Sequence, residues 1–354
     1  MNKPELLSPV GDFECLKSAV QNGANSVYLG ASSFNARARA TNFGNEELLE
    51  AIKYAKLRNV SVHLTLNTLI KNDEFENAVN LAVNAYNLGV DAIIVQDLGL
   101  ATYLLENYPE IPLHASTQMT VHNLDGVKQL ENFGFSRVVL SRELSLNEIK
   151  HIRENTSTEL EVFIHGALCI SYSGQCLLSS TIGGRSGNRG LCAQPCRLPY
   201  ELIENEKILD KGYLMSPRDN CALEFLPELI KLGIDSFKIE GRMKTPYYVG
   251  VVTKIYRKYI DLVLQNIHLD NITLKNMIQN KLNEKNFDTG LTDKEELTQV
   301  FNRGGFSTGH FKPSPNKDLV FKEKPNNMGF YIGTISHINE NKGHLKIKLE
   351  NTLS

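Results

Sequence analysis

Four of the six cysteines lie in one short segment, and their spacing suits a metal site. Cys169, Cys176, Cys192 and Cys196 form the pattern C-x6-C-x15-C-x3-C. Four soft, anionic thiolates are what a 4Fe-4S cluster or a tetrahedral zinc ion requires. The segment is also rich in glycine, which lets the backbone wrap closely around a metal and point N–H groups at sulfur. These residues therefore predict a metal site on the four cysteines.

The spacing alone leaves iron and zinc nearly balanced. Structural zinc sites usually contain two short C-x2–4-C units, and only Cys192 and Cys196 approach that form, which favours the cluster slightly. Reduced, packed cysteines are a third interpretation, but the surrounding loop is polar and not core-like. Cys15 and Cys221 lie within apolar helical patterns and are expected to be packed residues.

Composition indicates a soluble globular protein. Of the 354 residues, 42% are hydrophobic and 22% charged, and the formal charge of −2 provides no global attraction for polyanions. No apolar run approaches the roughly 20 residues needed to cross a bilayer. The N-terminal segment turns polar too early for a signal peptide. We therefore expect a cytoplasmic protein without a membrane partner.

The elements that must position the cysteines follow an α/β pattern, with short β-rich runs alternating with helical periodicity. Several helical stretches end in glycine at an expected C-cap. A TIM-type (β/α)8 barrel is favoured over a doubly wound open sheet, which would produce the same alternation. The predicted strands are Glu5–Ser8, Ser26–Gly30, Ser61–Leu66, Asp91–Gln96, Leu113–Ser116, Arg137–Ser141, Glu161–His165 and Ser236–Glu240.

Composition also predicts three units along the chain. Residues 1–270 form the barrel, with a Cys-rich insertion at 166–215 that ends in a hairpin. A long helix is expected over 247–264, where apolar residues recur at helical spacing. Residues 271–312 are expected to be a helical linker region. Residues 313–354 form a partial C-terminal β domain, with strands at 330–335 and 344–349.

Polar residues, His114 among them, lie at the ends of several predicted strands, where the active sites of barrels form. We assign catalytic roles to His165 and Glu240, although a structural histidine is as good an interpretation of His165. Arg142 and Arg242, together with Arg37, could bind a small dicarboxylate co-substrate through paired hydrogen bonds. Ion pairs at the barrel mouth explain these arginines equally well.

Basic residues near the cysteines could form a local phosphate-binding patch for RNA, although each alone is more simply a solvated charge. Arg185, Arg189 and Arg197 surround the cysteines, and Lys238, Arg242 and Lys244 belong to or follow the last predicted strand. Tyr172, Tyr247 and Tyr248 could stack on an unpaired base.

The segment from Glu161 to Ser179 resembles the signature of the peptidase U32 family: acidic-x-Phe-x-x-Gly-Ala-Leu-Cys, then Gly-x-Cys-Leu-x-Ser. Further matches are LLSPVGDFECLKSAVQNGANSVYLG, NRGLCAQPCRLPY, SFKIEGRMKTPYYV and FNRGGFSTGHF. The resemblance implies a 4Fe-4S cluster on Cys169, Cys176, Cys192 and Cys196, and prephenate-linked hydroxylation of RNA or of ubiquinone. It also implies an electron donor as partner.

The tail GGFSTGHF…KPNNMGFYIGTI is most similar to the branch that forms 5-hydroxyuridine at the tRNA wobble position. Relatives with this tail continue into further strands, which is why the C-terminal domain is expected to be incomplete. The leading hypothesis is thus an iron–sulfur-dependent tRNA hydroxylase. The alternative is a collagenase-like peptidase, a hydrolase for which the sequence offers no H-E-x-x-H and no G-x-S-x-G motif.

Overall fold

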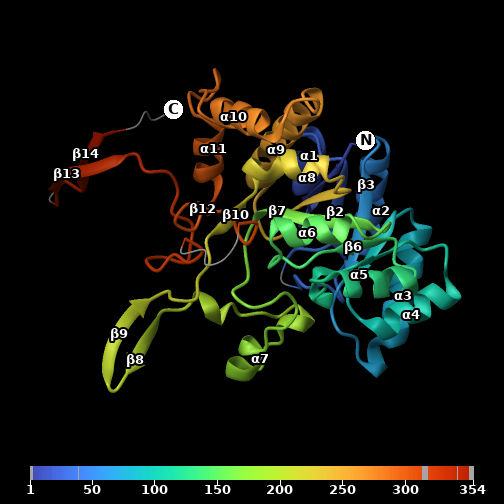
Figure 1. The fold of residues 1–354 in the computed structure, drawn as a ribbon. Coiled ribbons are helices and arrows are strands. Elements are labelled where there is room, and N and C mark those ends of the chain that lie inside the picture. The colour runs from blue at the N-terminus through green and yellow to red at the C-terminus, as the bar shows by residue number, and fades with distance from the viewer. Residues whose placement is uncertain (1–2, 39, 313–317, 341, 351–354) are drawn as a thin grey trace.

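A computed structural model describes residues 3–38, 40–312, 318–340 and 342–350. Its centre is a barrel of parallel strands. The first seven of these strands belong to the blue-to-green part of the chain in Figure 1, and β11 is the eighth. The barrel strands are β1 (Glu5–Pro9), β2 (Ser26–Gly30), β3 (Ser61–Leu66), β4 (Ala92–Val95), β5 (Leu113–Ala115), β6 (Arg137–Val139), β7 (Glu159–Gly166) and β11 (Ser236–Ile239).

The barrel closes where the last strand meets the first and the seventh. β11 pairs in parallel with β1, with Glu5 opposite Ser236, and also with β7, where Ser236 lies opposite Glu161. The remaining neighbours pair in chain order. This closure confirms the predicted TIM-type barrel and excludes the open sheet, in which two strands would remain at edges.

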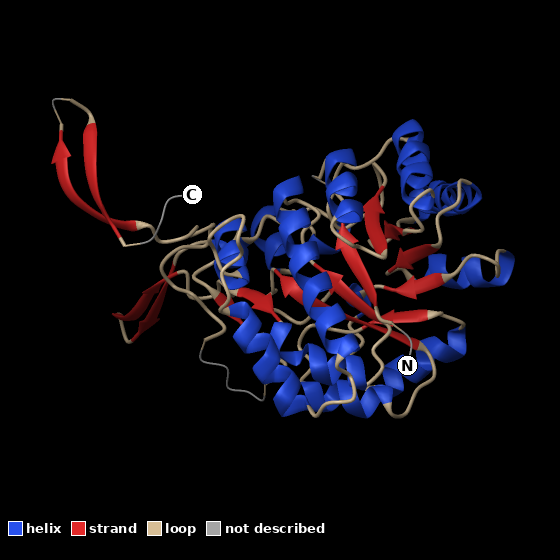
Figure 2. Ribbon diagram, turned by 90° about the horizontal axis from the view of Figure 1, so that it is seen from above, coloured by secondary structure: helices blue, strands red, loops and turns tan. Residues whose placement is uncertain are grey.

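Helices cover the outside of the barrel, and Figure 2 shows them around the central strands. Their starts follow from capping residues: the Asp12 carboxylate accepts a hydrogen bond from the Cys15 N–H (2.8 Å), and Ser145 and Glu148 form a capping box. These helices are α1 (Phe13–Gln21), α2 (Asn45–Lys56), α3 (Phe75–Asn87), α4 (Leu98–Asn107), α5 (Leu124–Phe133), α6 (Leu146–Arg153), α8 (Leu226–Lys231) and α9 (Pro246–Gln265).

After β7 the regular alternation stops, as the sequence predicted. The insertion contains α7 (Leu178–Gly183), two single helical turns η3 (Gly187–Arg189) and η4 (Pro195–Arg197), and an antiparallel hairpin of β8 (Tyr200–Glu204) and β9 (Lys207–Gly212). The hairpin extends away from the barrel (Figure 1).

Cys221 packs against the core as expected, but it does not lie in a helix. It ends the short strand β10 (Asp219–Cys221), which pairs antiparallel to β7, and the helical segment begins only afterwards with the turn η5 (Leu223–Phe225) and α8. The sequence did not separate Cys221 from the apolar helical run that follows it, because a strand of three residues is too short to show an alternation.

The C-terminal part first packs on the barrel and then departs from it. α10 (Asn271–Leu282) and α11 (Asp293–Val300) bury Leu274, Ile278 and Leu297, and β12 (Phe306–Ser307) pairs with β10. Beyond it, β13 (Gly333–Asn339) and β14 (His344–Leu349) form a separate hairpin, so the first of the two predicted tail strands begins three residues later than expected. None of the helices in the described residues is both long and apolar enough to cross a membrane.

Candidate functional site at the barrel mouth

An ion-pair network occupies the end of the barrel at which the parallel strands finish. Glu240, directly after β11, binds Arg37 through Oε1 (3.1 Å) and Arg142 through Oε2 (3.1 Å). Burial would raise the pKa of Glu240, but the charges of Arg37 and Arg142 outweigh it and lower the pKa to about 2. Two of the four residues assigned from sequence, Arg142 and Glu240, are thus in direct contact, and Arg37 joins them.

Arg142 reaches from the loop after β6 to the start of the insertion. Its Nη1 donates to the Ala167 carbonyl (2.9 Å), and its guanidinium lies 4.1 Å from the centre of the Phe163 ring. These contacts fix the guanidinium in one orientation. Its Nε is buried without a hydrogen-bond partner among the described residues.

Arg242 is buried beside this network but binds neutral groups. Its guanidinium donates to Asn35 Oδ1 (3.2 Å), Thr65 Oγ1 (2.9 Å) and Asn42 Oδ1. Gly30 makes room for it, since a Cβ there would lie 2.2 Å from Nη2. Burial lowers the pKa of Arg242 to about 10. Within the described residues no carboxylate lies at ion-pair distance from Arg242, so Glu240 pairs with two of the three guanidinium groups and the third has no ion-pair partner.

His165 lies apart from the Glu240 side chain. Its Nδ1 is 3.3 Å from the Tyr256 hydroxyl, and its ring packs against Tyr256 and Phe306 with centroids 5.4 Å away in each case. Burial lowers the pKa of His165 to about 3, so the imidazole is neutral at physiological pH. The two predicted catalytic residues are linked only through the backbone, where the Glu240 N–H donates to the His165 carbonyl (2.9 Å). The Nε2 of His165 is buried and has no partner in the described part of the chain.

The insertion brings the four cysteines into one region. All four are free thiols; Cys192 is exposed, and Cys169, Cys176 and Cys196 are half-buried. Burial raises the pKa of Cys196, and the charges of the other three thiols raise it further. The other three sulfurs therefore lie within electrostatic reach of Cys196.

The surroundings of the cysteines suit thiolates. The Gln194 N–H points at Cys192 Sγ (3.3 Å), as expected around a metal-bound sulfur. Gly187 lies beside Cys192, and a Cβ there would be in ordinary contact with the Cys192 Cβ at 3.7 Å. In the residues that the structure describes, no three His, Cys, Asp or Glu side chains are arranged to hold a single metal ion. The fit of the four thiols to a metal group therefore rests on their chemistry and on the N–H contact to Cys192.

The cysteine region borders the arginine network. The pKa of Arg37 is raised, mainly by the charge of Glu240, and the Cys192 thiolate is among the smaller causes. At Gly190, which has φ +76°, the insertion packs closely on the barrel loop that contains Asn35. A Cβ at this position would lie 2.3 Å from the Asn35 carbonyl oxygen. Insertion and barrel mouth are therefore one continuous site.

Several basic residues considered for RNA binding are already engaged within the protein. Arg189 forms a two-point ion pair with Glu74 (both distances 2.6 Å), and Lys238 is buried against Glu161 (2.7 Å). Arg197 donates to Ser216 Oγ (2.7 Å). Of the three tyrosines, Tyr172 and Tyr247 are exposed, whereas Tyr248 is buried.

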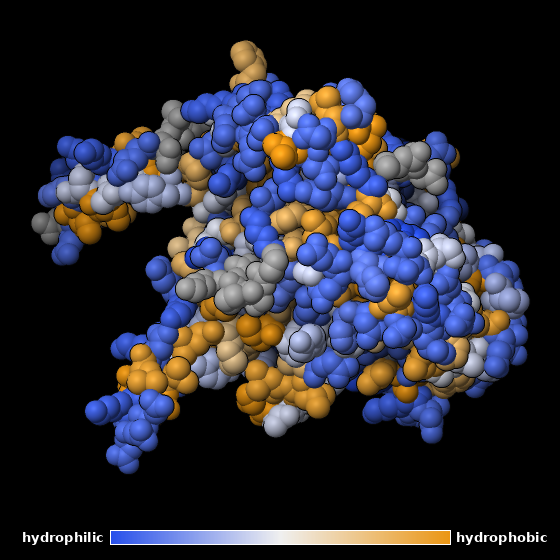
Figure 3. All heavy atoms as spheres, viewed as in Figure 1, coloured by the Kyte–Doolittle hydropathy of each residue, from blue (hydrophilic) through white to orange (hydrophobic). Residues whose placement is uncertain are grey.

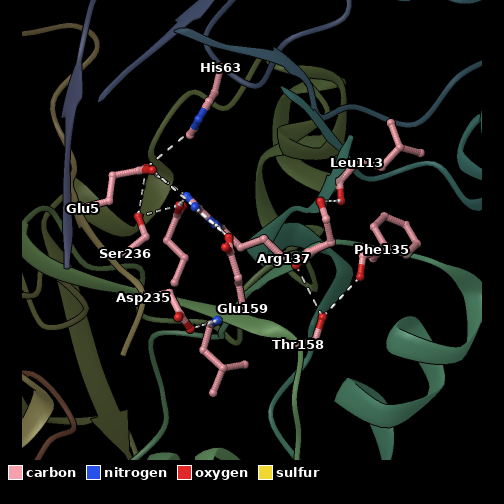
Figure 4. A network of polar contacts seen from close by, with 12 residues as sticks. Glu5, His63, Leu113, Phe135, Arg137, Thr158, Glu159, Asp235 and Ser236 are labelled. Atoms are coloured by element: carbon pink, nitrogen blue, oxygen red, sulfur yellow. Dashed lines mark hydrogen bonds and ion pairs between the residues drawn. The ribbon is translucent and has the colours of Figure 1, made fainter. Parts of the chain in front are cut away.

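A second polar network lies toward the amino ends of the strands (Figure 4). Arg137 binds Glu5 (2.8 Å), Glu159 (2.8 Å) and Glu161 (3.4 Å), so it links β1, β6 and β7. His63 and His114 pack edge to face at 4.9 Å. His114, which the sequence placed among the mouth residues, therefore belongs to this inner network.

Sequence reasoning missed the polar residues that hold Arg242, namely Asn35, Asn42 and Thr65. It also missed Ser173, whose N–H (3.1 Å) and hydroxyl (2.9 Å) donate to Glu143. The polar side chains in the loop directly after β2 could have indicated these residues, because that loop also follows a barrel strand and lies at the mouth.

Comparison with known proteins places the chain in a family. The model of "Peptidase family U32" matches residues 11–320. An uncharacterized protease of Methanocaldococcus jannaschii is 44% identical over 297 residues, which cover 81% of this chain and 72% of that protein.

Two bacterial relatives are named for RNA modification. The 23S rRNA 5-hydroxycytidine C2501 synthase of Escherichia coli is 36% identical over 352 residues, 99% of this chain and 51% of that protein. The tRNA hydroxylation protein P1 of Bacillus subtilis is 39% identical over 267 residues, 73% of this chain and 63% of that protein. This chain thus spans about half the length of the first and less than two thirds of the second. With the match over residues 11–320 and these identities, the chain belongs to peptidase family U32.

Proposed function

We propose that this chain is an iron–sulfur-dependent RNA hydroxylase that forms 5-hydroxyuridine at the wobble position of tRNA, with prephenate as a small dicarboxylate co-substrate. Two relatives named for hydroxylation of different RNAs support the reaction class. The observation that carries the proposal is the close packing of the Cys-rich insertion on the barrel mouth, where a Cβ at Gly190 would lie 2.3 Å from the Asn35 carbonyl oxygen.

A 4Fe-4S cluster would be held by Cys169, Cys176, Cys192 and Cys196. A single zinc ion at Zn–S distances of about 2.3 Å would draw the four sulfurs tightly together. The thiols influence one another, yet no three of the described metal-binding side chains are arranged around one ion. A cluster does not require three of these side chains around one ion, because each thiolate binds a different iron. Such a cluster would supply one-electron transfer when bound, and would need an electron donor as a partner.

The arginines would bind the dicarboxylate. Arg37, Arg142 and Arg242 bring three positive charges, and among the described residues Glu240 is the carboxylate that forms ion pairs with them. Because a buried charge without a partner is costly, an incoming dianion would be stabilised there. Arg242 is the strongest candidate, since its guanidinium is met by neutral oxygens alone.

Glu240 and His165 would then act in different ways. Glu240 is a positioning residue, because its carboxylate holds Arg37 and Arg142 at fixed distances. His165, neutral and with an unpartnered Nε2, could accept or share a proton with a substrate group that reaches it.

The alternative function is a U32-type peptidase, as the archaeal relative's name suggests. A peptidase of the serine or cysteine type needs a nucleophile hydrogen-bonded to a base. Among the described residues, the histidine side chains with hydrogen bonds are His122, bound to the Thr120 carbonyl, and His165, bound to Tyr256. Gelatin cleavage by the purified protein, lost on replacing one serine or cysteine, would favour this alternative.

The test is to delete the gene and digest the tRNA to nucleosides. 5-Hydroxyuridine and its derivatives should disappear, and the wild-type gene should restore them. Cys176→Ala should fail to restore them, whereas the matched control Cys15→Ala, which removes a thiol buried in α1, should restore them. Unchanged nucleosides in the deletion strain would overturn the proposal.

Anaerobic purification with iron, sulfide and zinc analysis tests the cofactor separately. We expect iron and sulfide in the wild type and in Cys15→Ala, and their loss in Cys176→Ala. Zinc in place of iron would contradict the redox role of the site.

A further inference from the structure

A cavity of about 290 Å³ lies between the barrel and the insertion, on the side of the mouth formed by β4 and β5. Its size is at the lower end of small-ligand pockets, which span about 300–1,000 Å³, so it suits one ring system and not an extended chain. Gln96 follows β4 and Gln118 follows β5, and both line it. The cavity is separate from the arginine network, because none of the arginines described above lines it.

The polar lining of the cavity is neutral. Four side-chain amides face it, from Gln96, Gln118, Gln175 and Asn188, and no charged side chain is among its described lining residues. An amide presents one acceptor and two donors, which matches the mixed donors and acceptors on the edge of a nucleobase. A dicarboxylate would find no positive charge here.

One of these amides lacks a partner. Gln96 is 92% buried, and its Oε1 has no hydrogen-bond partner among the described residues. A buried polar atom without a partner costs free energy, which a ligand donor would recover. Gln118, in contrast, is held by its Nε2–H bond to the Asn67 carbonyl (3.1 Å). Gln96 is therefore the buried amide of this lining whose oxygen has no hydrogen-bond partner among the described residues.

The rim of the cavity is apolar and exposed. Leu98 (53% exposed) and Leu177 (62% exposed) line it, and further apolar side chains gather over α7, at the lower edge of the molecule in Figure 3. Flat rings stack on such surfaces. Cys176 lies between two lining residues, Gln175 and Leu177, so a ligand here would sit next to one of the four thiols.

The cavity is built by firm contacts between loop and barrel. The Thr120 hydroxyl donates to the Ser173 carbonyl (2.7 Å) and accepts from Gln175 Nε2 (2.7 Å). On the other side, the Leu69 N–H donates to the Asn188 carbonyl (3.1 Å). Both walls that the insertion contributes are thus fixed to the barrel.

We propose that this cavity receives a single unpaired pyrimidine base of the RNA, turned out of its stack and read by Gln96. The assignment rests on the proposed function and adds to it the place of the target base, beside Cys176 and apart from the arginines that bind the dicarboxylate. Enzymes that modify a base commonly extrude it into a pocket with apolar walls and polar groups for its edge.

The test uses the full chain and an RNA stem-loop with one unpaired 4-thiouridine in its loop. Irradiation should cross-link that base to peptides containing residues 96–98, 118–120 or 174–177, and a stem-loop with 4-thiouridine in the paired stem should not cross-link there. Gln96→Leu should weaken binding of the uridine stem-loop about ten-fold, in line with the loss of a paired amide–base contact. The matched control Gln129→Leu, at an exposed position of α5, should not change it.

A stem-loop with an abasic site in place of the uridine separates a base contact from a general loss of folding. The wild type should bind it about as weakly as Gln96→Leu binds the uridine RNA, and Gln96→Leu should cause no further loss. The pocket assignment would be overturned if Gln96→Leu affected both RNAs equally, or if the cross-links lay outside these peptides. It would also be overturned if the protein did not bind RNA, or if millimolar prephenate displaced the cross-link. Because the nucleoside analysis is done in cells on the deletion strain, it can succeed while this test fails, and the two proposals are distinguished.

Discussion

At the scale of single residues, Glu240 is the carboxylate on which the mouth depends. Its two oxygens hold Arg37 and Arg142, and its pKa is lowered to about 2 by those charges. A carboxyl group whose pKa is depressed by folding stabilises the protein above its unfolded pKa, near 4.5, and this contribution is lost as the pH falls toward 2.

Glu240→Gln should therefore lower the free energy of unfolding by about 3 kcal/mol at pH 7, since it leaves two half-buried guanidinium groups without their counter-charge. The difference from the wild type should shrink between pH 4.5 and 2. Urea unfolding at several pH values measures it. Glu50→Gln, at an exposed position of α2, serves as the control and should change little. A difference that stays constant with pH would show that charge is not the cause.

At the scale of elements, the insertion depends on close approach to the barrel. Gly174 has φ +80°, and a Cβ there would lie 2.1 Å from the Gln118 carbonyl oxygen. Gly184, in the same insertion, has a similar φ of +67° but open space around its Cα. A side chain at Gly184 would therefore introduce backbone strain alone, whereas a side chain at Gly174 would introduce backbone strain and a steric clash.

Gly174→Ala should push the loop that carries Cys176 off the barrel and lower the iron bound after anaerobic purification several-fold. Limited proteolysis should also cut residues 170–198 faster. Gly184→Ala carries only the cost of a positive φ, about 1 kcal/mol, and should retain its iron. Equal loss of iron in both variants would show that strain, and not the contact with Gln118, controls the site.

At the scale of the whole molecule, the inner network holds the closure of the barrel. Arg137 on β6 binds Glu5 on β1 and Glu161 on β7, while Lys238 on β11 binds Glu161 (2.7 Å). These strands include the seam at which the last strand meets the first. Glu161 is fully buried, so its charge depends on both cations.

Arg137→Met should lower the free energy of unfolding by about 3–5 kcal/mol, because it leaves buried carboxylates without a partner. Adding Glu5→Gln should cost less in this background than in the wild type, since the two side chains interact. Urea unfolding of the single and double variants measures the coupling. Arg58→Met, at an exposed arginine that stacks on Tyr54, should cost under about 1 kcal/mol. Additive effects would contradict the proposed network.

Local patterns in the sequence determined most of the elements. Alternation of β-rich and helical segments located the eight barrel strands, and glycines such as Gly134 (φ +101°) ended the helices where expected. The insertion was also evident, because its glycine and cysteine content breaks the rhythm. Four clustered thiols could be recognised as a candidate metal site from residue types and spacing alone.

Only the tertiary structure decided how these elements meet. Closure depends on β11 pairing with both β1 and β7, and periodicity within a segment carries no information on such distant partners. The same holds for Glu240 and Arg37, which are about two hundred positions apart, and for Gln96 and Gln175, which share a cavity. His114 was placed at the wrong end of the barrel because a strand's sequence does not reveal how deep each side chain lies. Side-chain contacts between distant segments arise from packing, and packing is what the sequence alone did not specify.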